Sequence, residues 1–126
     1  MRVRIQPVQE PERVVAALNE QYRGRHCLVS LRHGPDKVAH AVMRFEKAYI
    51  DDEVPQSRTL RVVGHEPGSV EHASVALPLG EGFQAQLGAG DERSTLLRGD
   101  YQLTVVPVEH VDPHEVPGGV GDGRGA

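Results

Sequence analysis

The chain of 126 residues is short enough for one domain only, and 18 acidic against 14 basic residues give it a formal net charge of −4. The basic residues are scattered and aromatic residues are scarce, so nucleic-acid binding is not expected. The single cysteine, Cys27, excludes an internal disulfide and a metal site made of several thiolates. The sequence shows no charged-then-apolar leader and no long apolar run, so we expect a soluble cytoplasmic protein, or a subunit of an assembly made in the cytoplasm, without membrane contact.

The N-terminal part predicts a strand followed by an amphipathic helix. Residues 1–8 alternate apolar and polar side chains, which is typical of a half-buried strand. Pro11 suits the first position of a helix, and Val14, Leu18 and Tyr22 then recur at intervals of four. We expect this helix to pack its apolar stripe against a sheet.

Residues 26–32 predict a strand, and Gly34-Pro35-Asp36-Lys37 predicts the turn that follows it. Residues 38–50 fit two patterns, because one set of apolar residues alternates while another recurs at helical spacing. We choose a strand for this segment because the preceding strand and turn would make it the second arm of a hairpin.

The second half of the chain predicts four short strands separated by turns. They cover residues 59–65, 70–79, 83–87 and 101–108. Pro67-Gly68 indicates a type II turn, whose third residue needs a positive φ. Residues 111–126, rich in glycine and proline, predict a flexible tail after a single β-rich domain over residues 1–110.

Together these elements predict an α+β fold that is mainly β, either an antiparallel β-sandwich or a compact barrel, with one N-terminal amphipathic helix. The stretch Leu97–Val105, LRGDYQLTV, resembles the closing hairpin of many immunoglobulin-like sandwiches. That resemblance implies architecture only.

The stretch Leu28–Gly34, LVSLRHG, resembles the signature of the histidine phosphatases, in which an Arg-His-Gly ends a strand and the histidine takes a phosphoryl group. Residues 62–68, VVGHEPG, look like the late strand and second histidine of small family members. The resemblance implies His33 as the catalytic residue, Arg32 as a phosphate ligand and His65 as an assisting residue. Only roughly 30 residues separate the two histidines, which leaves no room for the βα units of the family. The phosphohydrolase is therefore an alternative hypothesis.

Seven histidines also suggest a metal site. The predicted hairpin would place His40 opposite Leu31 and make His33 and His40 diagonal neighbours on one face. Such a pair supplies half of a zinc site, and the sequence offers no convergent third ligand. His65 and His72 show the same spacing of seven positions.

The leading hypothesis is a non-catalytic, structural or accessory protein that binds a protein partner or self-associates, such as a subunit of a virion or of a bacterial complex. It assigns no catalytic residue, no metal and no cofactor, because the sequence contains no complete catalytic constellation. The two alternatives are a small phosphohydrolase using Arg32, His33 and His65, and a metal-binding module using His33 and His40.

Overall fold

A computed structural model describes residues 9–53, 58–89 and 92–108. Within these residues the chain forms one helix and seven strands, namely α1 (Pro11–Tyr22), β1 (His26–His33), β2 (Asp36–Asp51), β3 (Thr59–His65), β4 (His72–Pro78), β5 (Gln84–Gln86), β6 (Ser94–Arg98) and β7 (Tyr101–Pro107). The strand predicted over residues 1–8 and the tail predicted over residues 111–126 lie outside the described residues.

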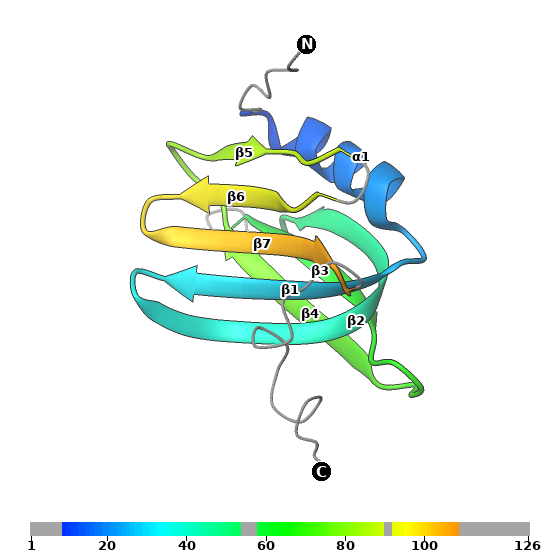
Figure 1. Ribbon diagram of the computed structural model, residues 1–126. Helices are drawn as coiled ribbons and strands as arrows, with labels where there is room; N and C mark the ends of the chain where they lie inside the picture. The colour runs from blue at the N-terminus through cyan, green and yellow to red at the C-terminus, as the bar shows by residue number, and fades with distance from the viewer. Residues whose placement is uncertain (1–8, 54–57, 90–91, 109–126) are drawn as a thin grey trace.

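All neighbouring strands pair antiparallel in one sheet, in the order β4-β3-β2-β1-β7-β6-β5 (Figure 1). The predicted class, mainly antiparallel β with one N-terminal helix, is confirmed. In the described part of the chain, β4 and β5 form the two ends of the sheet, which is not closed. Neither the predicted sandwich nor the predicted barrel is therefore confirmed.

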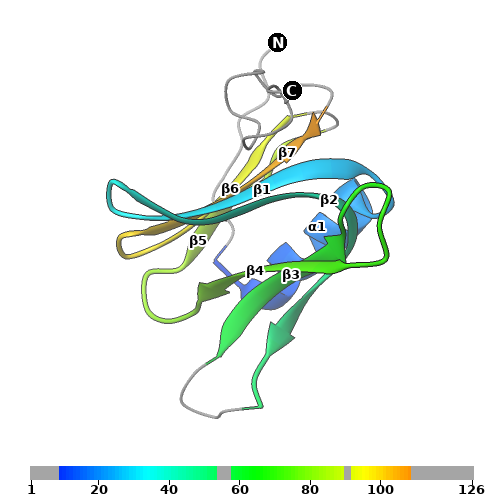
Figure 2. The ribbon, with the colours of Figure 1, turned by 90° about the horizontal axis from the view of Figure 1, so that it is seen from below.

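The sheet bends along strand β2 (Figure 2). Its first half pairs with β1 and its second half with β3, and Arg44 lies opposite both His26 and His65. The register with β3 then shifts by one residue, which leaves Glu46 as the extra residue of a β-bulge. Figure 2 shows β3 and β4 turned under β1 and β2, with α1 between the two parts of the sheet.

The bulge changes the spacing of the buried residues within β2. Met43 and Phe45 are fully buried at the strand spacing of two, whereas the next buried side chain, Ala48, follows at a spacing of three. The extra residue of the bulge shifts the inward-facing set by one position. The predicted strand over these residues is confirmed.

Helix α1 buries the apolar stripe that the sequence predicts. Val14, Leu18 and Tyr22 have no exposed surface and belong to one core cluster with side chains from all seven strands. Full burial of one large apolar side chain stabilises the fold by about 1.5–3 kcal/mol. The helix therefore fills the inside of the bent sheet.

Asn19 on α1 forms hydrogen bonds with the backbone of β2 beyond the bend of the sheet. Strand β1 begins at His26, opposite Arg44, so the second half of β2 has no described strand on that side. The amide Nδ2 of Asn19 donates to Ala48 O at 3.0 Å, and its Oδ1 accepts from the Ala48 N–H at 2.7 Å. These two bonds replace those that a neighbouring strand would make and keep the Ala48 backbone satisfied.

A series of hydrogen bonds through the buried side chains of Tyr22 and Ser94 links α1 to the segment before β6. The Tyr22 hydroxyl donates to Glu92 O at 2.8 Å and lies 2.8 Å from Ser94 Oγ, which accepts from the Gly88 N–H at 2.9 Å. Because the tyrosine proton goes to the carbonyl, the serine hydroxyl donates to tyrosine. Ser94 is the one buried polar side chain among the described residues, at 1% exposure. Burial of the hydroxyl raises the pKa of Tyr22.

Tyr22→Phe is expected to lower the free energy of unfolding by about 1–3 kcal/mol, because the Ser94 hydroxyl and the Glu92 carbonyl lose their partner. Urea denaturation measures this loss. The raised pKa means that the folded state holds the phenol proton more tightly, so wild-type stability falls as the pH rises above the ordinary tyrosine value of 10.0. Phenylalanine has no hydroxyl to ionise, so the free energy of unfolding of Tyr22→Phe should not show this decrease at alkaline pH. Equal stability of the two proteins at neutral pH would contradict the hydrogen-bonded chain.

Candidate metal centre at the bend of the sheet

Four polar side chains form a row across the bend. His26 on β1 lies opposite Arg44 on β2, Arg44 opposite His65 on β3, and His65 opposite His72 on β4. Directly opposed residues of an antiparallel sheet share a face. The row alternates with buried residues such as Phe45, so it points away from the core.

The turn between β3 and β4 brings His65 and His72 together. The type II turn predicted at Pro67-Gly68 is confirmed, because its closing backbone hydrogen bond measures 3.0 Å and Gly68 has a φ of +73°. The two histidines end up directly opposite each other. Their ring centroids lie 4.5 Å apart, with the ring planes tilted by 40°.

The bulge in β2 brings Glu46 to the same place. A bulge re-aims side chains because its extra residue has no partner in the ladder. Strand β3 can approach the bulge closely because it carries Gly64, where a Cβ would collide with Arg44 O and lie 3.0 Å from Met43 Sδ. On the side of α1, Arg23 Nε donates to Glu46 O at 3.1 Å and holds the bulge. Residues distant in the sequence, on β3 and after α1, therefore shape the backbone that presents Glu46.

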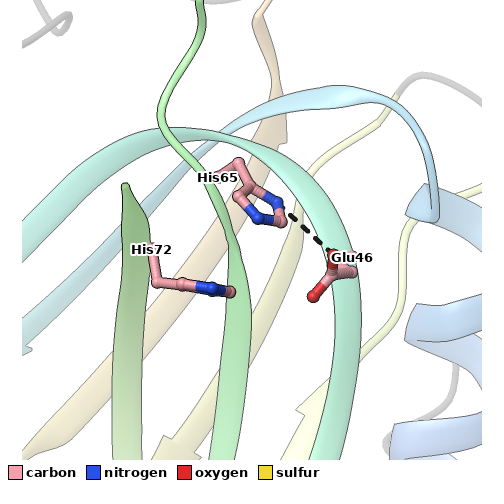
Figure 3. A group of neighbouring side chains, drawn as sticks. All are labelled: Glu46, His65 and His72. Carbon is pink, nitrogen blue, oxygen red and sulfur yellow. Dashed lines mark ion pairs between the residues drawn. The ribbon is translucent and has the colours of Figure 1, made fainter. Parts of the chain in front are cut away.

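Glu46, His65 and His72 form the candidate metal site (Figure 3). Each offers one ligand atom, and these atoms lie within 4.8 Å of one another. The distance from Glu46 Oε2 to His65 Nδ1 is 3.4 Å. The His65 side chain is 34% exposed and that of Glu46 49% exposed, and His72 is also exposed, so solvent reaches all three. Among the described residues no other group of three or more such side chains has this geometry.

This donor set suits a divalent ion of intermediate softness such as Zn²⁺. Zinc takes imidazole nitrogen at about 2.0–2.1 Å and carboxylate oxygen at about 2.0–2.2 Å, usually in a tetrahedron whose ligand atoms lie about 3.4 Å apart. Ligand atoms within 4.8 Å reach that geometry by small rotations of exposed side chains. Three protein ligands leave the fourth position open to an exchangeable ligand.

Basic side chains line the cleft beside Glu46 and His65. A cleft of about 640 Å³ that reaches Glu46 is lined in part by Arg23, Arg44 and Lys47. A neighbouring cleft of about 450 Å³ is lined in part by His26 and Arg44 and also by the acidic Glu66. Positive charge in the cleft beside Glu46 opposes the binding of a cation, and an anionic fourth ligand offsets it. This cleft therefore favours a negatively charged fourth ligand.

The structure does not bring the predicted phosphatase residues together. Arg32 and His33 end β1 at the β1–β2 hairpin, whereas His65 lies across the sheet from His26, at the other end of β1. The length of that strand places the two groups roughly 23 Å apart. Arg32 and His33 also face opposite sides of the sheet, and His33 stacks on Tyr101 with 4.3 Å between ring centroids. This geometry does not support phosphoryl transfer by His33.

The structure also separates His33 from His40. The β1–β2 loop has two residues, with Gly34 at a φ of +61°, as a type II′ turn needs at its first central position. The register then shifts by one residue between Leu31 and Arg32, so His40 pairs with Ser30 and not with Leu31, and the predicted register is wrong. Ser30 and His33 are three positions apart on β1 and face opposite sides. His33 and His40 therefore cannot share an ion in this arrangement.

Sequence reasoning missed Glu46 and His72 as neighbours of His65. A signal for His72 exists, because it follows His65 by seven positions across the predicted turn at Pro67-Gly68. Glu46 has no comparable signal, since it reaches the site through an irregularity of β2.

No helix of the described residues is long and apolar enough to cross a membrane. No model of a protein family, no curated protein and no solved structure matches the chain. The geometry of the site therefore has to carry the functional assignment.

Proposed function

We propose that this protein is a non-catalytic binding protein that holds a divalent ion of the Zn²⁺ type on Glu46, His65 and His72 and joins a protein partner through it. The observation that carries the proposal is the convergence of two imidazoles and one carboxylate, from three strands, within 4.8 Å. His65 and His72 lie directly opposite each other in the sheet. The backbone pairing of β3 and β4 therefore holds these two ligands in fixed positions.

Binding suits this site better than catalysis. Metal-assisted hydrolysis depends on a dry, shaped cavity in which donors stabilise the developing charge. The three ligands here are half-exposed or exposed on the outer face of the sheet. An open position on an exposed ion is accessible to a side chain of another molecule.

The charge around the site points to the kind of partner. Arg23, Arg44 and Lys47 line the adjoining cleft. A carboxylate from the partner would complete the coordination of the ion and at the same time pair with these cations. The partner we propose therefore presents an acidic side chain at its surface.

A zinc titration tests the site. The wild-type protein, purified without chelators, is expected to bind one equivalent of Zn²⁺ in competition with a chromophoric chelator. His40→Gln is the matched control, because His40 is exposed on the same face of the sheet and lies outside the three-ligand group. It should also bind one equivalent. Failure of the wild-type protein to bind zinc, or loss of the bound equivalent in His40→Gln, would contradict the proposal.

A further inference from the structure

Another polar cleft lies on the outer face of the sheet, nearer to the β1–β2 hairpin. Its volume is about 320 Å³. Its basic and neutral polar lining residues are Arg32, Lys37, Arg93, Ser30, Gln102 and Thr104. No acidic side chain of the described residues lines it. Its ionisable lining is therefore entirely basic.

The register of the sheet builds this cleft from β2, β1 and β7. Arg32 on β1 lies opposite Lys37 on β2 and Gln102 on β7, which makes one row of donors across three strands. In the next row, Ser30 lies opposite Thr104. Directly opposed side chains share a face, so all five converge on the same side of the sheet.

The direct pairing of Arg32 with Lys37 has an energetic consequence. Like charges directly opposite each other in a sheet destabilise it. Arg93, from the segment before β6, brings a third positive charge to the cleft. An anion seated between these cations removes the repulsion and gains charge-assisted hydrogen bonds.

We propose that this cleft binds the phosphate group, either as the free dianion or as a phosphomonoester. The planar guanidinium of Arg32 can donate to two phosphate oxygens at once, and Lys37 supplies a compact positive charge. The hydroxyls of Ser30 and Thr104 and the amide of Gln102 are neutral donors for the remaining oxygens. Chloride offers one acceptor atom, whereas phosphate offers several oxygens to this donor set and a second negative charge to its cations, so the phosphate dianion fits the cleft better than chloride.

The cleft gives Arg32 of the Arg-His-Gly stretch a role that needs no catalysis. Because His33 faces the other side of the sheet and stacks on Tyr101, it cannot reach a phosphate held by Arg32. The proposed phosphate site therefore does not use His33. This site is also separate from the three metal ligands, so neither proposal depends on the other.

Calorimetric titration at low ionic strength, with a chelator present, tests the cleft in the absence of metal. Inorganic phosphate is expected to bind at one site, and Arg32→Gln and Lys37→Gln should each weaken it about tenfold, because each removes a charge-assisted hydrogen bond. A second titration uses glycerol 2-phosphate. Equal affinities would show that the phosphate group alone is recognised, and tighter binding of the ester would identify a phosphomonoester as the ligand.

Arg61→Gln is the matched control. Arg61 lies on β3, forms an ion pair with Asp51 at 3.3 Å and does not line the cleft. It should bind phosphate as the wild type does. Thermal unfolding without phosphate checks the variants, and Arg32→Gln and Lys37→Gln should be no less stable than the wild type, since each relieves repulsion. No binding of either phosphate compound to the wild type, or equal binding by Arg32→Gln, would overturn the proposal.

Discussion

Gly64→Ala is expected to lower the free energy of unfolding by about 3 kcal/mol or more, at the upper end of the cost of overpacking. The added Cβ would collide with the carbonyl oxygen of Arg44 and lie 3.0 Å from Met43 Sδ. The carbonyl belongs to a paired strand and cannot rotate away as a side chain would. Urea denaturation of the purified variant measures the loss.

Val63→Ala is the control for this prediction. Val63 precedes Gly64 on β3 and is half-buried on the outer face, so its truncation should cost about 1 kcal/mol or less. Equal destabilisation by the two substitutions would show that the close approach of β2 and β3 at the bulge is not what requires glycine.

Removing one metal ligand is the second change with a large expected effect. Glu46→Gln, His65→Gln and His72→Gln should each weaken Zn²⁺ binding by more than about tenfold, because loss of an outer-shell partner alone weakens metal affinity about 10–100-fold. Competition with a chromophoric chelator measures the affinities. All three residues are exposed or half-exposed, so the variants should keep the wild-type circular dichroism spectrum and melting temperature without metal. Unchanged zinc affinity in any one of them would remove that residue from the site.

Helix α1 and the general strand pattern could be predicted because their causes are local. The stripe of Val14, Leu18 and Tyr22 needs only the helical period and a sheet to pack against, and all three side chains are fully buried. The turn at Pro67-Gly68 is equally local, since the type II geometry follows from the two residues themselves.

The register of the β1–β2 hairpin could not be predicted from the same information. One glycine at positive φ shortens the loop to two residues, and an irregularity after Leu31 shifts the pairing again. The shorter loop changes the register by two residues and keeps the faces, whereas the shift after Leu31 is by one residue and moves His40 to the face opposite His33. That is why the expected pair of His33 and His40 does not form.

The candidate site depends on long-range geometry of the same kind. His65 and His72 could be related through the turn between them, but Glu46 joins them only through the bulge in β2. The bulge in turn depends on the close approach that Gly64 permits. No periodicity within β2 shows which residue will be extra.

X-ray absorption at the zinc edge, on protein loaded with one equivalent of Zn²⁺, tests the proposed site most directly. The site formed by Glu46, His65 and His72 predicts two imidazole nitrogens at about 2.0–2.1 Å and the remaining ligands as oxygen. The imidazole contribution should fall to one ring in His72→Gln. A spectrum with oxygen ligands only, or one that His72→Gln leaves unchanged, would contradict a metal centre at the bend of the sheet.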